Sequence, residues 1–126
     1  MNGFTYDAGA LIAAERNDRR MWLIHQRALA RGDAPIVPAA ILTEVYRGKN
    51  AQLDRFLEGC KVEVLTEVLA RAAGMMLAEC KVDTGAVDAI VVENALRRGN
   101  AVVTSNVKHL AALAEGVGRK LEIVPV

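Results

Sequence analysis

The chain has 126 residues, of which 52% are apolar, with a mean hydropathy of +0.18 and a formal net charge of +1. This length fits a single domain over residues 1–126, and the composition excludes a disordered chain. The near-zero charge excludes a globally basic nucleic-acid binder, so a nucleic-acid role needs a local basic patch. The sequence shows neither a membrane-length apolar run nor a cleavable leader, so we expect a cytoplasmic protein without a membrane partner.

Hydrophobic periodicity and turn residues predict short strands that alternate with helices. In chain order, we expect strand 4–6, helices 8–15 and 19–31, strand 35–38, helices 39–47 and 51–57, strand 60–65, helices 67–80 and 87–98, strand 101–103, helix 107–114 and strand 121–124. Asp18 and Thr66 are the expected caps of two of these helices. The alternation indicates an α/β fold, with a central parallel sheet of about four to five short strands and helices on both faces.

Asp88 raises the main functional question, because it falls near the middle of an apolar helix face. Val87, Val91 and Ala95 lie on that face at about 100° per residue. Burying a carboxylate in a core destabilises the fold by on the order of several kcal/mol unless another group pairs with it. From the residues alone, Asp88 is either a ligand for a cation or a helix cap.

Further polar residues follow other predicted strands. Asp7 comes after the first strand, Thr104-Ser105-Asn106 follow the fourth, and Glu44 lies at the flank of an apolar helix face. Ligands of open α/β sheets bind beyond the carboxyl ends of the strands, and carboxylates from separate segments suit Mg²⁺ or Mn²⁺. Simpler interpretations stay open: Asp7 as a helix cap, Glu44 as a solvated residue and 104–106 as a turn.

The order and spacing of four segments resemble PIN-domain ribonucleases of the VapC type, the toxin half of type II toxin–antitoxin pairs, and most closely their actinobacterial members. The segments are Tyr6–Ile12, Val37–Gly48, Val87–Val92 and Val102–Asn106. The resemblance implies a three-layer PIN-like fold and a Mg²⁺ or Mn²⁺ ion held by Asp7, Glu44 and Asp88. It also implies an endoribonuclease that hydrolyses RNA phosphodiester bonds, with Thr104 and Ser105 near a water or a phosphate oxygen.

The chain departs from the family pattern at the fourth catalytic position. Many relatives carry acids in this turn, whereas this chain has Asn106 followed by Lys108 and His109. An amide supplies an oxygen ligand without negative charge, so binding of a second metal should weaken. This departure motivates the alternative hypothesis of a PIN-fold RNA-binding or regulatory protein with weak or lost catalysis. An unrelated nucleotide-binding module has no support, because the glycine-rich phosphate loops are absent.

An RNA substrate needs local positive charge on this near-neutral chain. The candidates are Arg16, Arg47 and Lys108, with Arg19, Arg20 and Lys49 close by in sequence; each is otherwise an ordinary solvated charge. The resemblance also implies a VapB-type antitoxin, a homodimer and a hetero-oligomer with the antitoxin. Two apolar stretches, 21–24 and 75–77, are candidates for either interface or core.

The remaining cysteines and histidines carry no recognisable site. Cys60 and Cys80 are expected to be reduced core residues, because they form no metal-binding spacing. His25 and His109 are expected at the surface, since neither has an identifiable ligand or nucleophile partner in the sequence.

Overall fold

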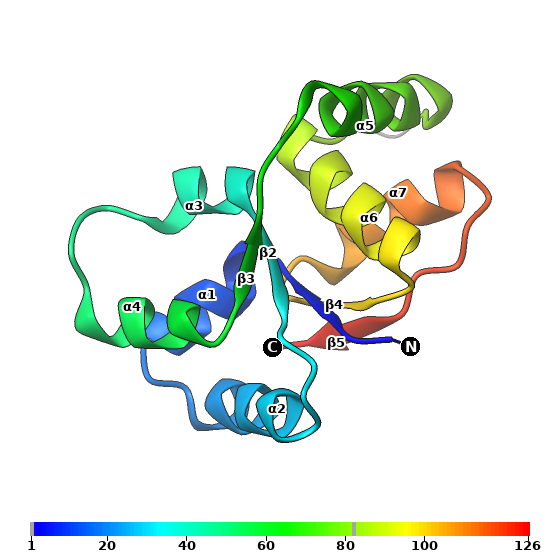
Figure 1. Cartoon of the computed structure of the whole chain (residues 1–126). Helices are drawn as coiled ribbons and strands as arrows, with labels where there is room; N and C mark the ends of the chain where they lie inside the picture. The colour runs from blue at the N-terminus through cyan, green and yellow to red at the C-terminus, as the bar shows by residue number, and fades with distance from the viewer. Residues whose placement is uncertain (1, 82) are drawn as a thin grey trace.

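The computed structural model describes residues 2–81 and 83–126. Its centre is a sheet of five parallel strands in the order β3-β2-β1-β4-β5 (Figure 1). The strands are β1 (Phe4–Tyr6), β2 (Ile36–Pro38), β3 (Lys61–Glu63), β4 (Ala101–Thr104) and β5 (Ile123–Pro125). Because all strands run in one direction, Asp7 and the 104–106 turn leave neighbouring strands at the same edge of the sheet.

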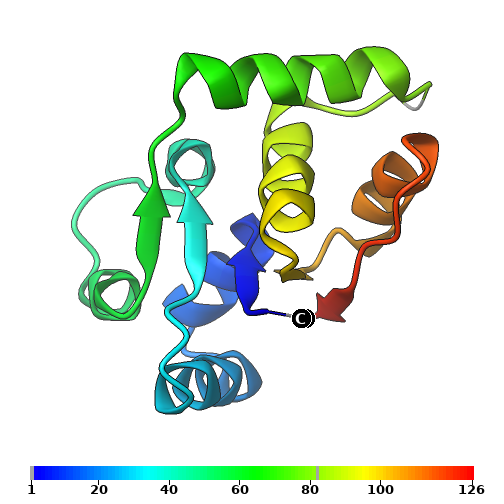
Figure 2. The same cartoon turned by 45° about the vertical axis from the view of Figure 1, so that its right-hand side comes forward.

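Helices cover both faces of the sheet, as the sequence predicts. They are α1 (Ala8–Glu15), α2 (Arg19–Ala30), α3 (Ala39–Val45), α4 (Ala51–Glu58), α5 (Glu67–Glu79), α6 (Ala86–Arg98) and α7 (Val107–Gly116). In Figure 1, α1, α2 and α4 lie on one side of the strands, and α6 and α7 lie on the other. Figure 2 shows α5 lying across the top of α6, against which it packs. The predicted three-layer α/β architecture is confirmed.

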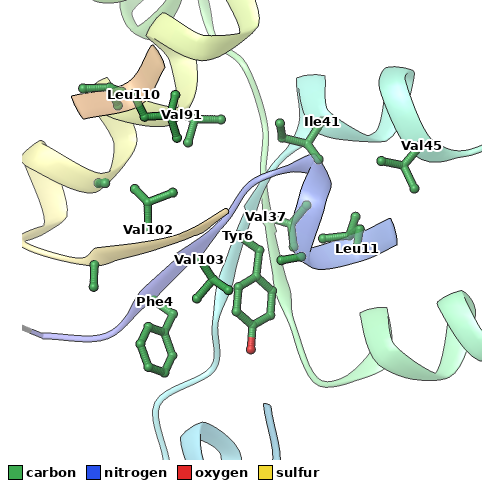
Figure 3. Close-up of a cluster of buried hydrophobic side chains, with 14 of the residues drawn as sticks. Phe4, Tyr6, Leu11, Val37, Ile41, Val45, Val91, Val102, Val103 and Leu110 are labelled. Atoms are coloured by element: carbon green, nitrogen blue, oxygen red, sulfur yellow. The ribbon is translucent and has the colours of Figure 1, made fainter. Parts of the chain in front are cut away.

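The core forms because successive residues of the central strands point to opposite faces. Tyr6 and Val103 lie on the side of α2 and α4, whereas Val102 lies toward Val91 of α6 and Leu110 of α7 (Figure 3). These five side chains are fully buried. The alternation holds β1 and β4 in register, with Tyr6 beside Val103, and so fixes where Asp7 leaves the sheet.

A polar network attaches α6 to two strands. The Thr5 hydroxyl donates to Asn94 Oδ1 (2.7 Å), and Asn94 Nδ2 donates to Glu63 Oε1 (2.8 Å). Arg97 and Arg98 both pair with the same Glu63 carboxylate. Thr5 and Asn94 are buried, and a buried polar group is tolerated only when it is hydrogen-bonded. The network therefore sets the position of α6 and, with it, of the carboxylate on its first turn.

Several expected boundaries differ from the structure by one or two residues. Strand β3 covers 61–63 rather than 60–65, since the chain leaves the sheet after Glu63 toward the Thr66 cap of α5. Helix α3 ends at Val45, because Tyr46 is extended and Arg47 donates to the carbonyls of Thr43 and Tyr46. No helix of the described residues is long and apolar enough to cross a membrane.

The structure contradicts one expectation about burial and divides two apolar stretches between core and surface. His25 is 2% exposed rather than a surface residue, because its Nδ1 lies 3.0 Å from the buried Tyr6 hydroxyl, which needs a polar partner. The stretches 21–24 and 75–77 are not uniformly core. Met21 is buried, but Leu23 and Met75 are exposed, since they face outward from their helices. Cys60 and Cys80 form no disulfide within the described residues, and they are half-buried and buried respectively.

Candidate functional site

Asp7 is a buried carboxylate at the carboxyl edge of the sheet. It occupies the N-cap position of α1, yet its side chain makes no capping hydrogen bond. Instead, the buried Thr104 at the end of β4 donates its hydroxyl proton to Asp7 Oδ2 at 2.6 Å. Burial raises the pKa of Asp7, and the Asp88 charge adds to this, against the lowering effect of the hydrogen bonds from Thr104 and the Ala8 amide. Asp7 is thus held in place but not neutralised.

Glu44 and Asp88 contribute negative charge to the same region from two further helices. Glu44 is exposed on α3, and desolvation followed by the charges of Asp7 and Asp88 raises its pKa. Asp88 lies on the first turn of α6, where it is half-buried and its Oδ2 accepts from the Thr84 hydroxyl at 2.9 Å. The structure therefore brings the three predicted carboxylates within electrostatic range of one another.

The interpretation of Asp88 as a helix cap is wrong, because Gly85 occupies the N-cap of α6. Compensation for Asp88 comes from the Thr84 hydroxyl and from its place near the positive end of the helix. Neither group neutralises its charge. Within residues 2–81 and 83–126, no lysine or arginine forms an ion pair with Asp7, Glu44 or Asp88.

The three carboxylates fit a divalent cation by their chemistry. They are hard oxygen donors, desolvation and the neighbouring negative charges raise the pKa of Asp7 and Glu44, and the chain supplies no basic partner in the part that the structure describes. In those residues, no three acidic, histidine or cysteine side chains are close enough to form a ready-made metal cluster. The donor set is therefore acidic, and none of its members is paired with a basic side chain in the described residues.

Gly9 brings α1 unusually close to the turn after β4, a contact that the sequence did not suggest. A Cβ atom at Gly9 would lie 2.6 Å from the Ser105 amide nitrogen and 2.3 Å from Ser105 Oγ. Real Cβ atoms essentially never approach other atoms so closely. Because Gly9 has no side chain, the 104–106 turn can lie beside α1 near Asp7. The only signal in the sequence was that Gly9 lies two residues after Asp7.

Asn106 is anchored through both its backbone and its side chain. Its amide N–H donates to Thr104 Oγ1 at 2.8 Å, and its Oδ1 lies 2.6 Å from Nδ1 of His109. His109 is exposed, as expected, but it has a partner that the sequence did not reveal. The signal that could have identified this pair is the spacing of three residues at the start of α7, which places both side chains on the same side of the helix.

The predicted RNA-binding residues are dispersed. Arg16 occupies the C-cap of α1, Arg47 binds carbonyls one turn beyond Glu44, and Lys108 is exposed beside Asn106. Thr104 is fully buried and uses its hydroxyl within the protein, whereas Ser105 is exposed. Ser105 and Lys108 are therefore the polar candidates that lie open to solvent next to the Asp7 edge.

The fold and its acidic edge define a PIN-like α/β domain. Three solved structures share this fold: VapBC2 from Rickettsia felis bound to a promoter DNA fragment (15% identity, 98% of both chains, TM-score 0.76), DNA-bound VapBC from Salmonella typhimurium (21%, 99% of this chain and 98% of that one, 0.64), and a toxin–antitoxin complex from Klebsiella pneumoniae (19%, 86% and 91%, 0.62). No protein-family model and no curated sequence matches the chain. The predicted resemblance is confirmed at the level of the fold.

Proposed function

We propose that the chain is a Mg²⁺- or Mn²⁺-dependent endoribonuclease toxin of the VapC type, inhibited by a cognate VapB-type antitoxin. The observation that carries the proposal is the buried, uncompensated Asp7 beside Glu44 and Asp88, at the carboxyl edge of a sheet shared with VapBC structures. A protein gains nothing in stability from leaving a desolvated carboxylate without a cation, so such a group supports a functional role.

Asp7, Glu44 and Asp88 would hold the ion. When bound, the ion would lower the pKa of a coordinated water and offset negative charge on the phosphodiester. The chain's own residues provide orientation: Thr104 fixes one oxygen of Asp7, Thr84 fixes one oxygen of Asp88, and the Glu63 network places α6. Glu44 is exposed to solvent, so an RNA strand could reach the site from the side of α3.

RNA cleavage by purified protein tests this proposal directly. Structured and single-stranded RNA would be incubated with Mg²⁺, with Mn²⁺ or with EDTA, using the wild type, Asp7→Asn and Asp88→Asn. Asp33→Asn, an exposed aspartate before β2, serves as the matched control. We expect metal-dependent cleavage that both site variants reduce by more than about 100-fold, since even outer partners of metal ligands contribute 10–100-fold. Cleavage that survives both substitutions would contradict the site.

The alternative function keeps the fold and the RNA but not the catalysis. Its basis is Asn106, which supplies no charge where many relatives carry an acid. RNA binding without cleavage in either metal would favour this alternative. In both cases Lys108, Arg47 and Arg16 are the proposed phosphate contacts, and removing one true contact should lower the salt dependence of RNA binding by about one unit of slope.

An antitoxin or a second copy of the chain would cover an apolar surface on β3 and α5, here called the β3–α5 surface. It consists of the exposed side chains Val62, Val64, Leu65, Val68 and Met75. These are five of the nine large apolar side chains that are exposed among the described residues, so they are concentrated in one segment. Concentrated apolar exposure of this kind marks interaction sites rather than ordinary surface.

Light scattering after size-exclusion chromatography tests this surface. A Val68→Asp, Met75→Asp double variant should shift a homodimer to monomer or block capture by a co-expressed antitoxin. The matched control is Leu23→Asp, Leu29→Asp, which places the same charges on exposed positions of α2. An equal effect of both double variants would show that general surface hydrophobicity, rather than the β3–α5 surface, controls assembly.

A further inference from the structure

The hydrogen bond between Asn106 and His109 determines what the fourth corner of the site presents. The Asn106 carbonyl oxygen Oδ1 lies 2.6 Å from His109 Nδ1. A carbonyl oxygen only accepts, so the hydrogen on this bond belongs to the imidazole, and His109 carries its proton on Nδ1. One of the two lone pairs on the oxygen that a cation would need is therefore already engaged by a hydrogen-bond donor.

The backbone of Asn106 is held by a second hydrogen bond, to Thr104. Its N–H donates to Thr104 Oγ1, and the Thr104 hydroxyl in turn donates its only proton to Asp7 Oδ2. A continuous series of hydrogen bonds therefore runs from His109 through Asn106 and Thr104 to Asp7. The backbone N–H of Asn106 and the oxygen of its side-chain amide are both held by hydrogen bonds.

The remaining polar atom of the Asn106 side chain is its amide nitrogen, Nδ2. Asn106 is half-exposed, its side chain does not cap α7, and Nδ2 has no hydrogen-bond partner within the described part of the chain. Its two hydrogens are donors, which repel a metal cation and bind an anionic oxygen.

We propose that the Asn106–His109 pair turns the fourth corner of the site into a hydrogen-bond donor for a phosphate oxygen of bound RNA. His109 is the positioning residue, and Asn106 Nδ2 is the contact. Asn106 then is not a ligand for a second divalent ion. The inference rests on the proposed nuclease function for the identity of its ligand, but its geometric basis is independent of that function.

The tautomer of His109 tests the geometry without any activity. Long-range ¹H–¹⁵N NMR of the neutral ring at alkaline pH should show the hydrogen on Nδ1 in the wild type. In Asn106→Ala the acceptor is lost, and the hydrogen should move to Nε2. A wild-type ring with its hydrogen on Nε2, or a tautomer unchanged in Asn106→Ala, would overturn the proposal while leaving the nuclease proposal intact.

Calorimetric titration with Mn²⁺ alone tests whether Asn106 is a metal ligand. We expect Asn106→Ala to bind Mn²⁺ within about twofold of the wild type, and Asn106→Asp to bind more tightly or to take up an additional ion, because it adds a charged oxygen donor. A tenfold or greater loss of Mn²⁺ affinity in Asn106→Ala would show that the wild-type amide coordinates the ion, and would overturn the proposal.

Binding of a fluorescent single-stranded RNA, measured by anisotropy in Ca²⁺, tests the phosphate contact. Asn106→Ala should weaken binding about tenfold, as expected for a hydrogen bond to a charged group. His109→Ala should weaken it less, and His109→Gln, which retains an N–H donor, should restore it. His109→Ala should leave the salt slope unchanged, in contrast to Lys108→Ala. Unaltered RNA affinity in Asn106→Ala would overturn the contact.

Discussion

Two carboxylates near α6, Glu63 and Asp7, have opposite pKa shifts. Glu63 at the end of β3 is surrounded by donors from Asn94, Arg97 and Arg98, which lower its pKa despite its desolvation. Asp7 at the end of β1 receives only the hydrogen bonds from Thr104 and Ala8, and its pKa is raised. Desolvation raises the pKa of both carboxyl groups, although Asp7 is buried and Glu63 only half-buried, and the opposite net shifts come from the partners that the chain supplies.

The comparison distinguishes a structural carboxylate from one reserved for a ligand. Glu63 stabilises the fold, because its charge is paired within the chain. Asp7 is left with Glu44 and Asp88, which carry charge of the same sign. A carboxylate whose pKa is raised by desolvation, with like charges nearby, is typical of functional sites, whereas a pKa lowered by pairing is equally typical of structural networks. If this distinction is correct, removing the two charges should change stability in opposite directions.

The largest effect is expected for Glu63→Gln, which leaves Arg97 and Arg98 without their shared carboxylate. We expect the free energy of unfolding to fall by about 2–3 kcal/mol, as for a partly buried ion pair that loses one partner. Urea denaturation measures this change. Glu67→Gln is the control, because its ion pair with Arg71 is more than three-quarters exposed on both sides and should contribute less than about 0.5 kcal/mol. Equal losses would contradict the structural role of Glu63.

A smaller effect is expected for Gly9→Ala, which tests how the geometry around Asp7 is maintained. The new methyl group would overlap the Ser105 amide, so the turn must shift, at a cost of about 1–3 kcal/mol. The chemical shifts of Thr104 and Asp7 should move in NMR spectra of the metal-free protein.

Gly74→Ala is the matched control for Gly9→Ala. Gly74 lies within α5 with open space around it, so alanine there should stabilise the protein by about 0.5–1 kcal/mol. If Gly9→Ala is also stabilising, the close contact between α1 and the 104–106 turn does not restrain the site.

Asp7→Asn should stabilise the metal-free protein, by about 1 kcal/mol, because it removes a desolvated charge that has no cationic partner within the described residues. The same urea titration measures this gain. Adding Mn²⁺ should reverse the order, since only the wild type gains stability from binding the ion. A loss of stability in metal-free Asp7→Asn would show that the Thr104 hydrogen bond compensates the charge fully, and that Asp7 resembles Glu63.

The arrangement of the strands and the three carboxylates was predictable from sequence because each depends on local pattern. Asp7 follows β1, Asp88 lies on the first turn of α6, and Glu44 lies near the end of α3, the helix that follows β2. The partners of these residues were not predictable in the same way. Glu63 is 31 residues from Asn94, and Gly9 is far in sequence from Ser105, so neither contact leaves a periodic signal.

His25 shows the same limit. Its place on α2 gave no sign that the buried Tyr6 hydroxyl, on a separate element, would need it as a partner. The hydrogen-bond partners of these side chains come from segments that are distant in sequence, whereas the helices and strands that carry them follow from local hydrophobic periodicity.

The smallest effect is a difference in pH dependence. The pKa of Glu63 is lowered in the folded state, so its stabilisation is present above its unfolded pKa of about 4.5 and is lost as the pH falls through the folded pKa. The pKa of Asp7 is raised, so its destabilisation is present above the folded pKa and disappears as the pH falls toward about 3.8.

Unfolding free energies measured between pH 7 and pH 4 should therefore show both variant–wild-type differences shrinking from opposite signs, by roughly 1 kcal/mol or less. Burial lowers the pKa of His25, so every variant loses stability as the pH falls below about 6.5, and the subtraction removes this common term. An Asp7→Asn gain that grows at lower pH would show that the chain itself stabilises the Asp7 charge, and the contrast with Glu63 would no longer hold.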